Sequence, residues 1–545
     1  MTQTDLFPGQ SGLPVDNPTE SYWLKEPSEK LLGHRTTEQL PRTADIVIVG
    51  SGITGAFAAH FLKEKNPDLD IVMLEAREAC CGATGRNGGH CQPAIYASAA
   101  TPHIGAFELR TYSYLKALVE EYSIPCDWRT TSGVHAFYSA ELFDMVRRAV
   151  ARLADSYPDL AANVAVVERG GTVPWLLEGE RREMTLDGLR VGGAEGAVVQ
   201  WNAASLWPYK LVAFVLERLL AAGRFNLQTN TPATGLSSSA ASTISPGTGP
   251  HDGSSTTLWT VHTPRGTVTA PRVLLATNAY TSHLLPQFAD LIVPVRGQVS
   301  ALKPPPPPSP PAAQSSPQPS SPQPPPPPQP PLDIGHTFVF AGEPDDPYSR
   351  DDYLVQRPPP AAELVFGGGR KHARGRGVGV WDDASTDGPV AWYLRGELGG
   401  LMDLSHRPSP SAPTTTTTAT TAAAAGEPEK KQDLEPTYEW TGIMGYSRDG
   451  HPWVGVVPPS LGGGGSGGRG LAMCAGFTGH GMPNAALCAK AVVSMMMTSD
   501  EEEVDLPPEY LLTETRVGAA RLLDEVDVVD AKGSLFMDFA GLGGL

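Results

Sequence analysis

The chain has 545 residues, which is enough for two or three domains, and a formal net charge of -18. This acidic excess argues against a nucleic-acid partner, because phosphate binding needs an excess of Lys and Arg. No run of 18 apolar residues occurs, so we expect neither a transmembrane helix nor a membrane partner. The six cysteines lack the C-x-x-C spacing of a metal site, and the N-terminus has no apolar core, which together favour reduced thiols and a cytoplasmic location.

Residues 1–43 are expected to form an extension with one packing anchor at residues 22–24. An apolar run at 46–49 follows, and then three glycines with G-x-G-x-x-G spacing, Gly50, Gly52 and Gly55. This order predicts a buried parallel strand, a tight turn and a helix whose N-terminus faces a pyrophosphate.

Each glycine of this motif has its own task. Gly50 permits the turn, Gly52 lets the pyrophosphate approach the backbone, and Gly55 lets the helix pack closely on the strand. A second apolar run ends at Glu75, 20 residues after Gly55, where a carboxylate accepts hydrogen bonds from ribose hydroxyls. The carboxylate disfavours the 2′-phosphate of NADP, so this unit predicts bound NAD or FAD.

A second glycine-rich loop, CCGATGRNGGHCQP, occupies residues 80–93 and contains a single cation, Arg86. Thr84, Arg86 and Asn87 are candidate donors to a phosphate or to the edge of a flavin ring. The alternative interpretation is an ordinary surface loop.

The remaining elements alternate between helices and strands. The pattern predicts helices over 107–122 and 205–222, the second with Pro208 in its first turn. A strand, a glycine-rich turn and a long helix are predicted over 471–497, which would direct a second helix N-terminus at a ligand. Further strands are predicted at 133–138, 196–200, 272–276, 353–356 and 363–369, the last two as a hairpin, and residues 225–236 are predicted to form a strand and a turn.

Four low-complexity stretches cannot build a core, and we interpret them as insertions at surface loops of one fold. The tract at 304–331 is nearly all Pro, Ser and Gln, so it predicts a polyproline-type tether, with an SH3- or WW-type ligand as the alternative. The four insertions are 237–256, 304–331, 406–432 and 461–468.

Residues 501–545 are expected to be a C-terminal tail.

Several motifs occur together in one order: GxGxxG, GATGRNGGH, LLATNAY, PVRGQ, YEWTGI followed by RDGHPWVG, and GFTGHGM. This set resembles the FAD-dependent amine and amino-acid oxidoreductases of the D-amino-acid oxidase superfamily (the glycine and sarcosine oxidase group), and within it the γ-glutamylputrescine oxidoreductase-like proteins. The resemblance implies FAD rather than NAD. It also implies a mixed α/β fold, in which a Rossmann-like FAD-binding domain (44–104, 190–290 and 438–500) is interleaved with an antiparallel-sheet substrate domain (105–189 and 291–437).

The resemblance also implies the residues that hold FAD. They are Gly50, Ser51, Gly52, Thr54 and Gly55 for the pyrophosphate, Glu75 for the ribose, Ala233 for the adenine, Thr84, Arg86, Asn87 and Gly88 for the flavin and phosphate side, and Gly476, Thr478, Gly479, His480 and Gly481 along the isoalloxazine. Because residues 440–445 contain no cysteine, FAD is expected to be non-covalent. A tether through His90 or Cys91 is the alternative.

The implied reaction is hydride transfer to flavin from a carbon that bears a neutral amine, followed by hydrolysis of the imine. Oxygen is the expected acceptor and hydrogen peroxide the product. The alternatives are a dehydrogenase with another acceptor, an inactive flavin fold that acts as a scaffold through its proline tract, and an NAD-linked enzyme. Candidates that face the amine or amino-acid substrate are His480, His90, Trp440, Tyr446 and, as a carboxylate clamp, Arg296; each could instead be a packed core residue.

Overall fold

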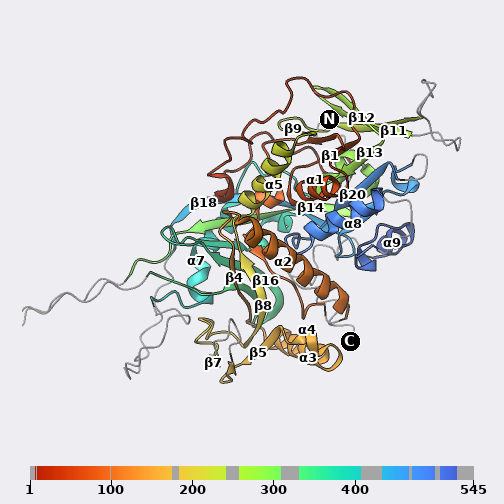
Figure 1. Cartoon of the computed structure of the whole chain (residues 1–545). Helices are drawn as coiled ribbons and strands as arrows, with labels where there is room; N and C mark the ends of the chain where they lie inside the picture. Colours follow the sequence, from red (N-terminus) through yellow and green to blue (C-terminus); the bar gives the residue numbers. More distant parts are fainter. Residues whose placement is uncertain are drawn as a thin grey trace, which may run out of the picture.

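The structure is a computed structural model that describes residues 6–7, 9–98, 100–174, 183–240, 257–307, 331–406, 433–464, 469–497 and 504–523. Two large sheets form its centre, one built mostly of parallel strands and the other mostly of antiparallel strands (Figure 1). Both sheets draw strands from both halves of the chain, so the two parts are interleaved as the sequence predicts.

The first sheet has the strand order β19-β20-β13-β1-β2-β9. All neighbours are parallel except β19 and β20. The apolar runs of β1 and β2 are buried along their whole length, as expected for strands covered on both faces. The strands are β1 (Ile46–Val49), β2 (Ile71–Leu74), β9 (Phe225–Gln228), β13 (Arg272–Leu275), β19 (Trp453–Val456) and β20 (Leu471–Ala475).

Three helices belong to this sheet: α1 (Ile53–Lys65), α5 (Pro208–Ala222) and α8 (Ala485–Met497). Helix α1 packs between α5 and α8 (Figure 1). Pro208 is the first residue of α5, where its missing N–H costs nothing, as predicted. A small antiparallel sheet of β10 (Gly235–Ala240), β11 (Thr257–Thr263) and β12 (Gly266–Ala270) lies at the edge.

The second sheet has the order β18-β14-β17-β16-β15-β4-β8-β3, with β5 beside β8. Only β15 and β4 pair in parallel among its described strands. The predicted hairpin is formed by β16 and β17. The strands are β3 (His90–Cys91), β4 (Arg129–Phe137), β5 (Val164–Glu168), β8 (Gly196–Ser205), β14 (Ile292–Leu302), β15 (Thr337–Glu343), β16 (Asp346–Gln356), β17 (Leu364–Gly368) and β18 (Pro436–Ser447).

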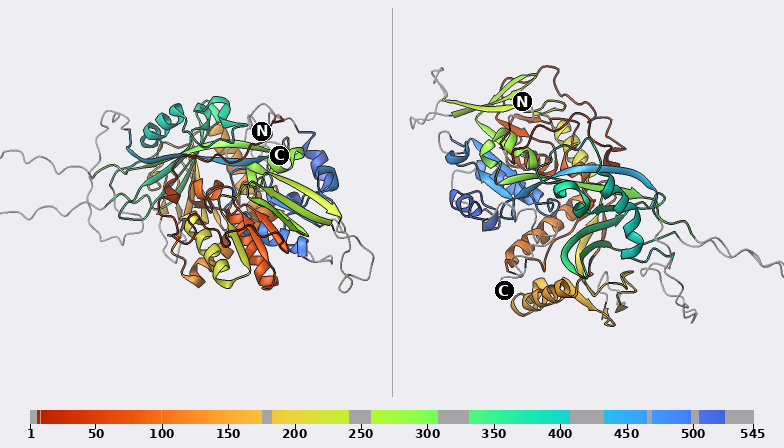
Figure 2. Two further views of the ribbon diagram at one scale, coloured as in Figure 1. Left: turned by 90° about the horizontal axis from the view of Figure 1, so that it is seen from above. Right: turned by 180° about the vertical axis from the view of Figure 1, so that it is seen from behind.

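The long paired strands β14 and β18 run from one sheet towards the other (Figure 2). The remaining elements include the long helix α2, which is buried along one face, and several shorter pieces. They are α2 (Pro102–Tyr122), α3 (Ala140–Ser156), α4 (Pro158–Ala161), α6 (Thr281–Leu284), α7 (Gly388–Leu401), α9 (Glu514–Ala520), β6 (Val173–Pro174), β7 (Glu183–Met184) and the 3-10 turns η2 (Tyr22–Leu24), η3 (Ala83–Arg86), η4 (Asn278–Tyr280), η5 (Pro286–Phe288), η6 (Arg370–His372), η7 (Arg374–Gly377), η8 (Pro459–Leu461) and η10 (Pro508–Tyr510). Within the described residues, no helix combines the length and apolar content needed to cross a membrane.

The structure differs from the expected boundaries in two places. Strands β3, β8 and β18 belong to the second sheet, although the sequence places their residues in the FAD-binding ranges. Residues 504–523 are not a free tail, because Tyr510, Leu512 and Val517 are buried against the first sheet's core. The apolar side chains in this stretch are too sparse to form a pattern of their own.

The low-complexity insertions lie largely outside the described residues, and so does the proline tract at 308–330. The N-terminal extension is fixed where the sequence predicts an anchor, since Tyr22 and Trp23 are buried.

Candidate functional site

A large cavity lies at the carboxyl ends of β1, β2 and β13, where parallel sheets usually bind ligands. Between its lining residues about 1860 Å³, open solvent included, is not filled by atoms. The cavity continues from the first sheet to β14 and to Tyr353 and Arg370 of the second part. A ligand in it would therefore contact both parts of the fold.

The first glycine loop forms one wall of this cavity without side chains. Gly50 has φ +105°, and a Cβ there would lie 2.5 Å from the carbonyl oxygen of Ala276. A Cβ at Gly55 would lie 2.0 Å from the carbonyl oxygen of Gly50, so the close contact between helix and strand requires glycine. Gly50, Gly52 and Thr54 line the cavity together with Ser51, and Gly55 lies behind them as a packing residue.

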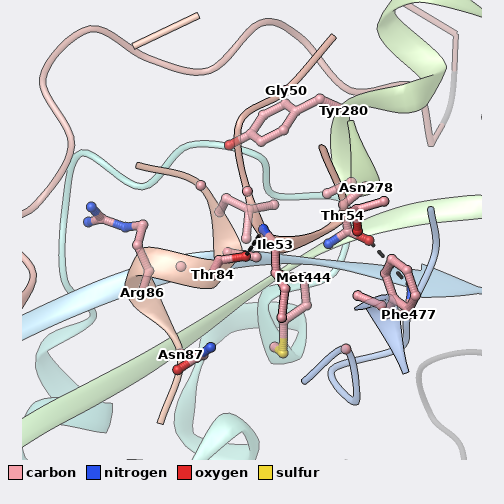
Figure 3. A pocket seen from close by; sticks show the side chains of 18 of the residues that line it. Gly50, Ile53, Thr54, Thr84, Arg86, Asn87, Asn278, Tyr280, Met444 and Phe477 are labelled. Carbon is pink, nitrogen blue, oxygen red and sulfur yellow. Dashed lines mark hydrogen bonds between the residues drawn. The ribbon is translucent and has the colours of Figure 1, made fainter. Parts of the chain in front are cut away.

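The N-terminus of α1 faces the second glycine loop. Thr84 Oγ1 accepts a hydrogen bond of 3.1 Å from the N–H of Ile53, the first residue of α1 (Figure 3). A Cβ at Gly52 would lie 3.1 Å from the same oxygen. The two loops therefore lie close together at the N-terminus of α1, which suits a pyrophosphate held by amide N–H groups.

Glu75 lines the cavity at the end of β2, as the sequence predicts. Its Oε2 accepts from the N–H of Ser51 (3.0 Å) and from the Ser51 hydroxyl (2.6 Å), and its Oε1 accepts from the N–H of Arg77 (3.0 Å). These donors fix the carboxylate in one orientation. Ala233 also lines this end of the cavity.

Arg86 lines the cavity, but its guanidinium is used mainly by the protein. Nε donates to the carbonyl oxygen of Thr441 (2.6 Å) and Nη2 to that of Thr19 (2.5 Å), while Asp383 lies 3.2 Å from Nε. In Figure 3 the side chain points away from Ile53 and Thr84. Its Nη1 is buried without a hydrogen-bond partner in the described structure, so a ligand acceptor would satisfy it.

Asp383 is fully buried between two guanidinium groups, those of Arg86 and Arg77. Arg77 donates to both of its carboxylate oxygens, at 2.9 and 3.2 Å. The two guanidinium groups therefore share one buried carboxylate, and a second carboxylate, that of Glu75, lines the same cavity.

Asn87 and Gly88 line the cavity beyond Arg86. The Oδ1 atom of the Asn87 side chain accepts from the N–H of Gly89 at 2.8 Å, and the backbone carbonyl oxygen of Asn87 accepts from the Trp23 indole at 2.5 Å. The N-terminal anchor therefore holds the second glycine loop in place.

The residues of the C-terminal glycine turn, 476–481, have two tasks: some shape the turn and others line the cavity. The Gly476 N–H donates to Asn278 Oδ1 (3.0 Å), and the Thr478 N–H donates to the carbonyl oxygen of Gly445 (2.8 Å). These two residues shape the turn, and Thr478 has φ +50°. The next three residues, Gly479, His480 and Gly481, line the cavity ahead of α8.

His480 is held by a buried carboxylate. Its Nε2 lies 3.0 Å from Oε2 of Glu108, which is 3% exposed. Burial by itself raises the pKa of Glu108, but His480, the Ala94 N–H and Asn484 together hold that pKa below its usual value.

His90 also lines the cavity, and its ring lies 5.7 Å from that of Tyr353. Burial lowers the pKa of His90 to about 4, so the imidazole is neutral at physiological pH. Cys91, the alternative tether, is fully buried and does not line the cavity as the described residues form it.

The other three substrate-facing candidates do not line the cavity as the described residues form it. Trp440 is fully buried, and its indole donates to the carbonyl oxygen of Arg86 at 2.9 Å. Tyr446 is buried with its ring 5.3 Å from the Arg370 guanidinium. Arg296 donates to the carbonyl oxygen of Asp382 and the hydroxyl of Ser385, at 3.3 and 3.4 Å.

Sequence reasoning missed Arg370, which lines the far end of the cavity. Its Nε and Nη2 donate to Oδ2 of Asp351, at 3.0 and 2.6 Å. The preceding glycine run was an available signal: Gly368 has φ +127°, and a Cβ at Gly367 would lie 2.3 Å from the Tyr353 ring. A run of glycines that ends in arginine indicates a backbone shaped to present that cation.

The match with known proteins covers most of the chain. Residues 45–495 match the family model DAO, described as FAD dependent oxidoreductase. Among curated relatives, γ-glutamylputrescine oxidoreductase of Escherichia coli (strain K12) is 30% identical over 97 residues, which is 16% of this chain and 22% of the relative. The probable oxidoreductase OrdL of Rhizobium meliloti (strain 1021) is 24% identical over 273 residues, 48% of this chain and 55% of the relative.

These alignments span about half or less of each curated relative, whereas the matches to solved structures are nearly complete. Glycine oxidase from Geobacillus kaustophilus superimposes with a TM-score of 0.58 at 18% identity, over 87% of this chain and 99% of that one. L-amino acid deaminase from Proteus vulgaris gives 0.57 at 15% identity, over 89% and 98%. L-proline dehydrogenase from P. horikoshii gives 0.54 at 15% identity, over 85% and 96%.

At these identities the solved structures establish the shared fold, while the family match covers both glycine loops, the C-terminal turn and both sheets. The glycine walls, the fixed Glu75 carboxylate and, among the described residues, the unpartnered Nη1 of Arg86 suit a dinucleotide. The chain belongs to the DAO family of FAD-dependent oxidoreductases, and FAD is its cofactor.

Proposed function

We propose that this enzyme oxidises the C–N bond of an amine or amino acid by hydride transfer to FAD, and that oxygen then accepts the electrons and forms hydrogen peroxide. The observation that carries this proposal is the group of residues at the far end of the cavity. The cation Arg370, the neutral His90 and the Glu108-bound His480 all border one space with the C-terminal glycine turn.

The names of the structural neighbours support an amine that carries a carboxylate. They specify glycine, an L-amino acid, L-proline and, for a further neighbour with a TM-score of 0.54, iminodiacetate. All four are small molecules with an amine nitrogen near a carboxyl group.

Arg370 is our candidate for the carboxylate ligand in place of Arg296. Asp351 occupies Nε and Nη2 of the Arg370 guanidinium, so Nη1 is left to bind a ligand oxygen. Gln298 supports the same end, because it lines the cavity and its Nε2 is buried without a hydrogen-bond partner in the described part of the chain. An acceptor oxygen of a substrate would satisfy both groups.

Bound FAD supplies the two-electron acceptor. The protein's part is to orient the C–H bond beside it, to exclude water and to have the amine nitrogen unprotonated when the hydride leaves. Trp440 and Tyr446 remain predicted active-site residues that act through Arg86 and Arg370. We further propose that FAD is bound non-covalently and that the enzyme is cytoplasmic; a partner for the proline tract stays a prediction.

The test begins with the purified holoenzyme under anaerobic conditions. Glycine, L-proline, L-alanine and propylamine are added in turn, and loss of flavin absorbance near about 450 nm reports reduction. Admission of air and a peroxide assay then separate an oxidase from a dehydrogenase, since reduced flavin that persists in air would contradict oxygen as acceptor.

Arg370→Gln and Arg296→Gln form a matched pair for the carboxylate site. Loss of a charge-assisted hydrogen bond costs roughly 1.5–3 kcal/mol. We therefore expect Arg370→Gln to raise KM about 10- to 150-fold for the amino acid that is turned over, and Arg296→Gln to leave KM unchanged. The reverse result would assign the carboxylate to Arg296.

A further inference from the structure

Glu108 is a buried charge that the proposed reaction has not yet used. It lies on α2, outside the lining of the cavity, and contacts His480, which lines it. A fully enclosed carboxylate is costly unless each oxygen receives hydrogen bonds.

Donors surround this carboxylate. Oε2 accepts from the Ala94 N–H at 2.6 Å and faces His480 Nε2 at 3.0 Å, while Oε1 accepts from Asn484 Nδ2 at 2.9 Å. Asn484 is itself fixed, because its Oδ1 accepts from the Tyr510 hydroxyl at 3.0 Å. An ionised carboxylate can only accept, so Nε2 of His480 carries the hydrogen of this contact, and in a neutral ring the basic nitrogen is then Nδ1.

Other titratable groups face this pair, and burial keeps each of them uncharged. Burial lowers the pKa of His135 on β4 to about 3, and it raises the pKa of Cys91 on β3, of Cys488 on α8 and of Tyr510. His90, whose pKa burial lowers to about 4, is neutral too. Glu108 is the carboxylate that contacts Nε2 of His480.

We propose that His480 takes the proton that the substrate's ammonium carries into the cavity, and that Glu108 is the positioning residue that holds His480 in the tautomer able to take it. This inference rests on the proposed amine oxidation. An aliphatic amine is mostly protonated at neutral pH, and a nitrogen without a lone pair cannot support hydride departure from the neighbouring carbon.

The step balances within the site. One N–H bond of the ammonium breaks, and its electron pair remains on the amine nitrogen as the lone pair. A new N–H bond forms at His480 Nδ1, and the positive charge moves from the substrate to the imidazole ring. Glu108 stabilises the imidazolium through the existing Nε2–H contact.

The test compares Glu108→Gln, Glu108→Asp and His480→Gln as holoenzymes. The rate of anaerobic flavin reduction is measured from pH 6 to 10 with the member of the amine panel that reduces the wild type. Removal of the carboxylate charge should move the pH of half-maximal rate upward by about one unit or more, with a limiting rate at high pH close to that of the wild type. Glu108→Asp should keep the wild-type pH midpoint. His480→Gln should show the same upward shift of this midpoint as Glu108→Gln, and the double variant that carries both substitutions should show no larger shift.

Glu509→Gln is the matched control, because it removes the carboxylate of an exposed pair with His103, also on α2, at 2.7 Å. Its pH profile should equal that of the wild type. A rate loss that is equal at every pH in Glu108→Gln would mean a merely structural role and would overturn the inference.

A second readout does not depend on turnover. In holoenzyme labelled with ¹⁵N-histidine, the His480 signals, identified by their absence in His480→Gln, should show one tautomer protonated at Nε2. Glu108→Gln should show a mixture of tautomers, and a wild-type ring protonated at Nδ1 would contradict the inference. If no amine reduces the bound flavin, the proposed function fails while this spectrum still tests the role of Glu108.

Discussion

Substitution of Gly55 tests how closely α1 must approach β1. A methyl group at this position would lie 2.0 Å from the carbonyl oxygen of Gly50 and 3.4 Å from Cγ2 of Ile48. Heavy atoms essentially never come closer than 3.0 Å to a Cβ, so α1 would have to move by at least 3.0 − 2.0 = 1.0 Å. The obstructing atom belongs to the backbone and cannot rotate away.

The cost of Gly55→Ala follows from two opposing effects. Overpacking a close contact costs about 1–3 kcal/mol, and the higher helix propensity of alanine returns up to about 1 kcal/mol. Because the contact involves backbone on both sides, we take the upper part of the first range and expect a net loss of about 2 kcal/mol. Helix α1 also packs on α5 and α8, so the shift is opposed on its outer side.

Gly52→Ala is the matched comparison, because its methyl group would meet only the Thr84 side chain, with Oγ1 at 3.1 Å. That hydroxyl can move by a few tenths of an ångström, so the fold should keep its stability. The methyl group would nevertheless intrude where the pyrophosphate approaches the backbone, so FAD affinity should fall.

Urea unfolding of the two apoproteins and FAD titration of each separate these effects. Gly55→Ala should unfold at lower urea, and Gly52→Ala should unfold like the wild type but bind FAD weakly. An unfolding free energy for Gly55→Ala within about 0.5 kcal/mol of the wild type would refute the argument from close approach.

Three further outcomes are expected. Burial raises the pKa of Asp352 to about 7, so between about pH 4 and 7 the folded state binds more protons than the unfolded state. The free energy of unfolding therefore falls by up to about 4 kcal/mol as the pH rises through this window. In Asp352→Asn, the urea midpoint of unfolding should fall less over the same pH range. Burial lowers the pKa of His336 to about 3, so between about pH 6.5 and 3 the unfolded state binds a proton that the folded state does not. The free energy of unfolding therefore decreases as the pH falls through this window. In His336→Gln, the urea midpoint should decrease less over the same range. Removal of residues 1–18 deletes the cavity residues Leu13 and Pro14, and also the 2.9 Å hydrogen bond from the Ser11 N–H to the Ser282 hydroxyl. This variant should therefore lose FAD faster on dialysis than a control variant that lacks only residues 1–5. Equal retention would contradict a role of this segment in holding FAD.

The fold was predictable where a local pattern reports a local constraint. The run at 46–49, the glycine spacing and Glu75 require no distant partner, and the structure forms the strand, turn and helix as expected. The hairpin of β16 and β17 was predictable for the same reason, since its strands are close in the chain.

Contacts over long sequence distances were not predictable in this way. The sequence identifies Arg86 correctly as the cation of the second loop, but its guanidinium binds Thr441, 355 residues away, and Thr19, 67 residues away. Glu108 left a weaker signal: it lies one helical turn from Ile104 and from Tyr112, on the buried face of α2, where a carboxylate must have a partner. That partner, His480, is 372 residues away, in the turn between β20 and α8.

The ion cluster beside the cavity explains why parts outside the family match contribute to the cofactor site. Asp383 lies between Arg77 and Arg86, and the Glu75 carboxylate lines the same cavity. Thr19, which precedes the matched residues 45–495, accepts from Arg86 at both its carbonyl and hydroxyl oxygens and so fixes the guanidinium without neutralising it. We expect the pyrophosphate of FAD to accept a hydrogen bond from Nη1 of Arg86, which is buried without a partner in the described structure. Because the same cluster joins the N-terminal segment, the second glycine loop and the loop that carries Asp383, we expect FAD binding and the packing of these three segments to stabilise one another.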